Sequence, residues 1–199
     1  MRMKKGEKQM GKVKVGIIIV ILIAMVGGYY FYLSNFRDTD EETVVTEVQD
    51  VLLKNLDTDY PPTPRELLKY YSDITKCLYN EKYTEEQLEQ MADKMLALYD
   101  AELAENNPRD EYIKNLKKDV EDFLNSGYTI STYTTSRSTE VEEYTSEGRK
   151  YAKLYCTYTI KSGADYKTTQ EVFVLRRDVD TSRWKIFGFD VVNPEQPAQ

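Results

Sequence analysis

Residues 149–177 read RKYAKLYCTYTIKSGADYKTTQEVFVLRR, and this stretch decides the fold. Side-chain character alternates over residues 149–161, which is the pattern of a strand with one buried face. A turn signal at 162–165 separates this run from a second run over 166–177, and a short turn leads to a third over 183–192. Short turns between such runs predict an antiparallel meander. The predicted inner face of the first run consists of Ala152, Leu154, Cys156, Tyr158 and Ile160.

The chain before Gly127 has helical spacing of its apolar residues instead. Capping boxes at residues 63–66 and 84–87 and the dipeptide Asn107-Pro108 each predict the start of a helix. A further helix is predicted over residues 43–56.

Helices followed by strands indicate the α+β class. We expect about four helices (residues 43–127) to pack on one face of a four-stranded antiparallel meander (residues 128–192). The first strand of this sheet is the polar run over 128–139, and residues 193–199 are predicted to be a disordered tail.

Residues 15–33 form an uncharged run, VGIIIVILIAMVGGYYFYL. As a helix it is long enough to cross a hydrocarbon core of about 30 Å. Six basic side chains and only Glu7 precede it, so the positive-inside rule places the N-terminus in the cytoplasm. We therefore expect a signal-anchor in the lipid bilayer: a basic cytoplasmic tail (1–14), one transmembrane helix (15–33), a linker (34–42) and an extracytoplasmic domain (43–192) at the cell membrane.

A cleaved signal peptide is the alternative, because Val26-Gly27-Gly28 offers a small-residue cleavage site. The apolar run continues for five residues beyond Gly28, and no A-x-A motif accompanies it. An uncleaved anchor fits this pattern better.

Composition excludes several classes of function. The chain has no histidine, which rules out Ser-His-Asp and Cys-His triads and imidazole zinc ligands. Residues 38–199 carry 20 basic and 33 acidic side chains, and such a surface repels nucleic acid. No calcium-loop spacing, CxxC pair or phosphate loop occurs. We therefore predict no metal, no cofactor, no nucleic-acid partner and no catalytic residue.

Six short phrases carry a resemblance to a known family: residues 56–61 (LDTDYP), 63–66 (TPRE), 99–103 (YDAEL), 107–108 (NP), 175–178 (LRRD) and 184–186 (WKI). Together they resemble an uncharacterised family of membrane-anchored proteins of Gram-positive gut anaerobes. The last strand with Trp184-Lys185-Ile186 also resembles the final strand of extracytoplasmic NTF2-like domains. The resemblance implies an NTF2-like outer domain and brings no catalytic residues with it.

Three residues are candidates for lining a ligand pocket: Tyr158, Trp184 and Asp190. Asp190 shares strand parity with Trp184 and Ile186, so it is expected to point into an apolar region. Burial there would raise its pKa and suit it to acid or base chemistry. The alternatives are an Asp190 that points outward or one that ends the strand. Trp184, the single tryptophan, is also expected to anchor the core.

Cys77 and Cys156 are the two thiols of the chain. A disulfide between them would join a helix to the sheet and close a loop of about 80 residues, contributing roughly 4 kcal/mol. The alternative is two buried free cysteines that act as small apolar residues.

These features favour a non-catalytic binding or assembly module at the outer membrane face, with an unknown protein or small-molecule partner outside the cell. One alternative is a subunit of a cell-envelope or secretion machine. Another is a small hydrolase or isomerase that uses a carboxylate and tyrosine in a conical pocket.

Overall fold

The computed structural model describes residues 46–192. The predicted N-terminal tail (1–14), transmembrane helix (15–33), linker (34–42) and C-terminal tail (193–199) lie outside these residues. Among residues 46–192, no helix is both long and apolar enough to span a bilayer.

The described helices all precede Gly127, and the described strands all follow it. The helices are α2 (Glu47–Leu53), α3 (Pro64–Asn80), α4 (Glu85–Leu98), α5 (Ala101–Glu105) and α6 (Arg109–Asn125). The strands are β1 (Tyr128–Thr135), β2 (Glu142–Ser146), β3 (Arg149–Ser162), β4 (Asp165–Arg177) and β5 (Trp184–Val191), with a 3-10 turn η1 (Ser138–Glu140) before β2.

Threonine caps begin three of the helices. Thr46 and Thr84 form complete capping boxes with Gln49 and Gln87, and the Thr63 hydroxyl accepts a hydrogen bond from the Glu66 amide at 3.2 Å. The two predicted boxes therefore mark helix starts, as expected. The apolar stripe of α3 is fully buried against the sheet and neighbouring helices: Leu67, Leu68, Ile74 and Leu78.

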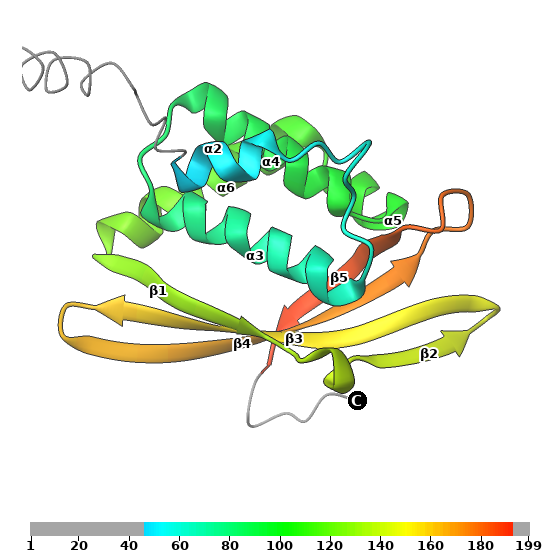
Figure 1. The fold of residues 1–199 in the computed structure, drawn as a ribbon. Helices are drawn as coiled ribbons and strands as arrows, with labels where there is room; N and C mark the ends of the chain where they lie inside the picture. Colours follow the sequence, from blue (N-terminus) through cyan, green and yellow to red (C-terminus); the bar gives the residue numbers. More distant parts are fainter. Residues whose placement is uncertain (1–45, 193–199) are drawn as a thin grey trace, which may run out of the picture. The chain divides into compact units, whose positions relative to one another are not determined.

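The sheet is antiparallel with the order β1-β3-β4-β5, and β2 also pairs with β3. β1 pairs with the second half of β3 and β2 with its first half, so the two short strands share one edge of the long strand. Figure 1 shows the helices gathered on one face of this sheet, with α3 lying directly over it. The α+β class and the one-sided helical layer are confirmed.

Two details of the predicted architecture were wrong. The sheet has five strands rather than four, because the charged segment Glu142–Ser146 pairs with β3 although all five of its residues are exposed. There are also five described helices rather than four, because the helix that starts after Thr84 stops at Leu98 and α5 begins separately at Ala101.

The break between α4 and α5 joins the helical layer to the sheet. Tyr99 is extended and forms an isolated parallel bridge with Ile186 of β5, and the Asp100 amide donates to the Ile186 carbonyl at 2.8 Å. The Asp100 carboxylate also caps α5 by accepting from the Glu102 amide at 3.0 Å. The edge of β5 is thus partly covered by this short extended segment.

A buried ion pair fixes the same junction. Arg176 of β4 donates to both carboxylate oxygens of Asp100, with the Arg176 Nε–Asp100 Oδ2 distance at 3.0 Å. The Asp100 side chain is 4% exposed and that of Arg176 is 6% exposed. A second acid, Glu102, lies 2.9 Å from the guanidinium, which also stacks over the Phe187 ring at 4.3 Å. Removing either partner would leave an unpaired buried charge.

A bulge in β5 changes which residues face the helices. Leu175 pairs with Ile186 and Val174 pairs with Gly188, so Phe187 has no partner across the ladder. After the bulge, Phe189 instead of Asp190 lies on the helix-facing side, where its ring stacks on Phe173 at 5.4 Å.

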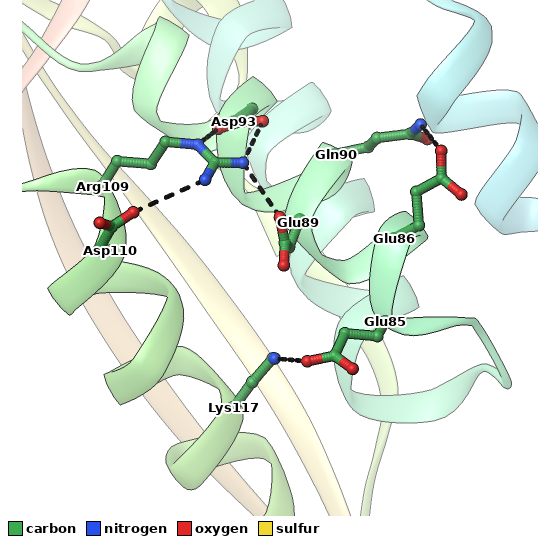
Figure 2. A network of polar contacts seen from close by, with 8 residues as sticks. All are labelled: Glu85, Glu86, Glu89, Gln90, Asp93, Arg109, Asp110 and Lys117. Atoms are coloured by element: carbon green, nitrogen blue, oxygen red, sulfur yellow. Dashed lines mark hydrogen bonds and ion pairs between the residues drawn. The ribbon is translucent and has the colours of Figure 1, made fainter.

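An exposed ion-pair network connects α4 to α6, as Figure 2 shows. The Arg109 guanidinium at the start of α6 binds Asp93 at 2.6 Å and Glu89 at 3.3 Å, and Lys117 pairs with Glu85 further along. Single exposed pairs stabilise little, but several partners on one guanidinium restrict how α6 lies on α4.

Trp184 is buried at the start of β5 as expected for a core anchor. Its carbonyl accepts a hydrogen bond from the Tyr60 hydroxyl at 2.7 Å, and the Arg177 guanidinium lies 5.8 Å from its ring. This contact holds the segment between α2 and α3 against the sheet.

Trp184→Ala should destabilise the domain by about 3 to 5 kcal/mol, because it removes a buried aromatic ring and leaves a cavity. Denaturant unfolding of the full chain, followed by circular dichroism, measures the change. Tyr166→Ala is the matched control, since Tyr166 is 59% exposed and its loss should cost less than about 0.5 kcal/mol. Equal effects of the two substitutions would show that Trp184 is not a core residue.

Candidate functional site

A pocket of about 400 Å³ lies between the helical layer and the helix-facing side of the sheet. α3 and α6 supply one wall, and β1, β3, β4 and β5 supply the other. The rim includes exposed residues, among them Asn115, Asp119 and Phe189, while the inner lining is buried. The buried lining consists of Tyr71, Leu78, Met95, Tyr99, Leu116, Ile130 and Tyr158.

Seven aromatic rings line this pocket, and several of them contact one another in tilted or edge-to-face arrangements. Tyr79 meets Phe123 with the ring centroids 4.7 Å apart at 63°, and Tyr99 meets Tyr112 at 5.9 Å and 78°. Such arrangements place the positive edge of one ring on the negative face of the next. The full set is Tyr71, Tyr79, Tyr99, Tyr112, Phe123, Tyr158 and Phe189.

Two hydrogen bonds between the Asn80 side chain and the backbone of Ile130 hold the edge strand β1 against α3, and we call this pair of bonds the clasp. Asn80, the last residue of α3, donates to the Ile130 carbonyl at 2.6 Å and accepts from the Ile130 amide at 2.8 Å. The pairing of β1 with β3 is irregular immediately after Ile130. There the Asn80 side-chain amide bonds both backbone groups of Ile130, as a neighbouring strand would. The clasp holds Ile130 in the pocket lining.

Burial keeps the pocket hydroxyls protonated. Desolvation raises the pKa of Tyr79 to about 12 and raises the pKa of Tyr71, Tyr112 and Tyr158 well above the ordinary value. Three tyrosine hydroxyls of the pocket already donate within the protein: Tyr158 to Ser72 Oγ at 3.1 Å, Tyr99 to the Tyr112 hydroxyl at 3.4 Å and Tyr112 to Met95 Sδ at 3.5 Å. At neutral pH these groups act as neutral hydrogen-bonding groups and not as bases.

Glu171 is the carboxylate that enters the pocket wall from β4. It is half-buried, and desolvation raises the pKa of its carboxyl group. Among residues 46–192 no hydrogen bond or ion pair engages this side chain. The sequence analysis missed it, although its strand parity with Phe173 and Leu175 was a usable signal for a helix-facing position.

The three residues predicted to share a pocket are separated by the structure. Tyr158 lines the pocket. Trp184 does not, because it packs near Tyr60 at the beginning of β5. Asp190 is exposed, and its carboxylate accepts from the Val191 amide at 2.7 Å. The expectation of an inward Asp190 was wrong because the β5 bulge reverses the parity of the residues after it.

Cys77 and Cys156 are both buried and free, so the structure has the second of the two predicted arrangements and not the disulfide. Cys156 Sγ lies 3.3 Å from Ser72 Oγ. Burial raises the pKa of the Cys77 thiol to about 12 and also raises the pKa of Cys156. Neither thiol is therefore activated as a nucleophile.

The chemistry available in the pocket is recognition by aromatic faces, hydroxyl groups and two carboxylates, Glu171 in the wall and Asp119 at the exposed rim. Within residues 46–192, no group of three or more acidic, cysteine or histidine side chains is placed to hold a metal ion.

The fold and the site define an α+β domain with an aromatic pocket between its helices and its sheet. The family described as "Domain of unknown function (DUF6715)" matches residues 3–189, and the chain belongs to this family. No curated protein matches the chain.

Glu171→Gln should stabilise the domain at neutral pH and lose this advantage on acidification. Burial raises the pKa of Glu171 in the folded state, so the carboxyl group of the unfolded chain loses its proton at a lower pH. The free energy of unfolding of the wild type therefore falls as the pH rises from the ordinary glutamate pKa to the raised pKa of the folded state. Below the ordinary glutamate pKa, both states are protonated and the two proteins should differ little. Thermal unfolding from pH 4 to pH 8 measures this, with exposed Glu142→Gln as the control. A gain that is the same at every pH would contradict an electrostatic cause.

Proposed function

We propose that the described domain is a non-catalytic binding module that holds a small molecule in the pocket between α3, α6 and the sheet. The pocket itself is the observation that carries this proposal. Its volume of about 400 Å³ suits a small organic ligand, and its lining combines twelve apolar or aromatic side chains with six polar or charged ones. A sheet face completely filled by helix side chains would instead have favoured a pure assembly role.

We also propose that the domain is NTF2-like. Its helices-then-sheet order and its one-sided helical layer support this assignment. NTF2-like domains often place a strand between their early helices, and the parallel bridge from Tyr99 to Ile186 is a minimal equivalent of such a strand.

A carboxylate–tyrosine enzyme is a second candidate, and Glu171 is the observation in its favour. A general acid or base gains from a pKa shifted toward neutrality, and tyrosine hydroxyls surround the same pocket. However, catalysis also needs free donors aimed at a developing charge. The Tyr158 and Tyr99 hydroxyls already donate within the protein, which favours binding over catalysis.

The binding module is proposed to sit outside the cell on a single-pass anchor formed by residues 15–33. The uncharged run and the basic residues before it support this location.

The anchor proposal predicts that the mature chain keeps residues 1–33 and stays in the membrane fraction after an alkaline carbonate wash. Intact-mass spectrometry of the protein from its native membrane identifies the N-terminus. An N-terminus at Tyr29, with release into the soluble fraction, would show that the segment is a cleaved signal peptide.

The pocket proposal predicts that small aromatic probes shift the NMR signals of pocket tyrosines. The full chain, labelled with 3-fluorotyrosine in a nonionic detergent, is titrated with three probes of similar shape: phenyltrimethylammonium, 2-phenyl-2-propanol and 2-methyl-2-phenylpropanoate. At least one probe should shift Tyr112 and Tyr158 while exposed Tyr144 and Tyr166 stay unchanged.

Thr169→Phe places a larger side chain in the pocket. It should weaken the affinity for the probe about tenfold or more, which corresponds to about 1.4 kcal/mol of binding free energy. Thr168→Phe is the matched control, because Thr168 is exposed and the strand alternation places it on the opposite face. If no probe of any charge shifts a pocket tyrosine, the pocket is not a binding site. Equal effects of the two substitutions would lead to the same conclusion.

A further inference from the structure

We propose that the pocket selects organic cations, namely an amine or quaternary ammonium group carried on an apolar body. This inference rests on the proposed function, since it names the class of ligand that the binding module takes. It follows from three features of the lining: its charges, its aromatic faces and the environment of Glu171.

The charge of the lining is entirely acidic. Eighteen residues of the described chain line the pocket, of which Glu171 and Asp119 are acidic and none is basic. An anionic ligand would meet two carboxylates and no counter-charge, whereas a cation would be attracted by both. The acidic excess of residues 38–199 would add long-range attraction for a cation.

The basic residues of helix α6 (Arg109, Lys114, Lys117 and Lys118) all line a groove other than the pocket. The helix presents Asn115, Leu116 and Asp119 to the pocket. Its lysines line that other groove, next to α4, where Lys117 pairs with Glu85. Lys118 in the same helix pairs with Asp122. The basic residues of the pocket's own helical wall are thus turned away from the pocket or already paired.

The aromatic lining suits a cation for a second reason. Tyrosine and phenylalanine rings attract cations at their faces through the ring quadrupole, most strongly where water is excluded. Seven such rings line one pocket, and edge-to-face contacts keep Tyr79, Tyr99 and their partners in fixed orientations. Because burial holds the hydroxyls in their protonated form, the rings attract a cation through their faces, without a phenolate charge.

Glu171 lacks the partner that a cation would supply. No other residue of the range 46–192 binds its carboxylate, and its charge contributes to the raised pKa of the hydroxyls of Tyr79, Tyr99 and Tyr158. A desolvated carboxylate is costly unless it is paired. A ligand cation beside Glu171 would provide the counter-charge, and it would also lower the pKa that burial raises.

The three probes of the pocket test separate charge from shape, because they carry a positive, a neutral and a negative group on the same phenyl scaffold. Their dissociation constants are measured by fluorotyrosine NMR on the full chain at pH 7.5, with empty detergent micelles as the partition control. We expect phenyltrimethylammonium to bind about tenfold or more tightly than 2-phenyl-2-propanol. The anion 2-methyl-2-phenylpropanoate should be the weakest of the three.

Glu171→Gln should reduce the ratio of cation to alcohol affinity about tenfold, while Glu142→Gln, on the exposed strand β2, should leave that ratio unchanged. An alcohol or anion that binds as tightly as the cation would overturn the cation proposal and leave the binding module standing. A cation preference that survives in Glu171→Gln would overturn the role of Glu171 as the counter-charge. Failure of all three probes would overturn both proposals together.

Discussion

The buried ion pair between Asp100 and Arg176 is the interaction on which the arrangement of helices over the sheet depends. It ties the junction of α4 and α5 to β4 across the intervening strand β5. Two charges this deeply buried are tolerated only when they stay paired, so the junction has little freedom to move. Tyr99 precedes Asp100 directly, and its ring contacts Tyr112 of α6. The Asp100–Arg176 ion pair, which lies outside the pocket, therefore restrains the part of the pocket wall that Tyr99 forms.

Local signals were sufficient to predict four of the five described helices and four of the five described strands. Threonine capping boxes act within one turn, so Thr84 could be assigned as a helix start without any knowledge of its surroundings. The inner face of β3 followed from alternation alone, and Ala152, Leu154 and Cys156 are indeed fully buried. β2 could not be found in this way, because its residues are exposed and its pairing with β3 is the only reason it is a strand.

The candidate site could be predicted only in part, because it depends on contacts between distant segments. Tyr158 lies on a strand whose alternation is regular, so its inward position was predictable. Asp190 was assigned to the wrong face, because its local sequence pattern does not indicate that β5 has a bulge at Phe187. Trp184 was correctly expected to be buried, yet its partner is Tyr60, far away in the chain. Glu171 stands in a polar run, and only the approach of α3 and α6 makes its environment apolar.

The bulge at Phe187 also makes the pocket rim sensitive to chain length. If one residue after the bulge, such as Gly188, were deleted and the bulge kept, Asp190 would take the place of Phe189 opposite Phe173. An aromatic ring at the rim would become a carboxylate without any substitution in the rim itself. A change of length in β5 would therefore alter the side chains at the pocket rim without an exchange of any rim residue.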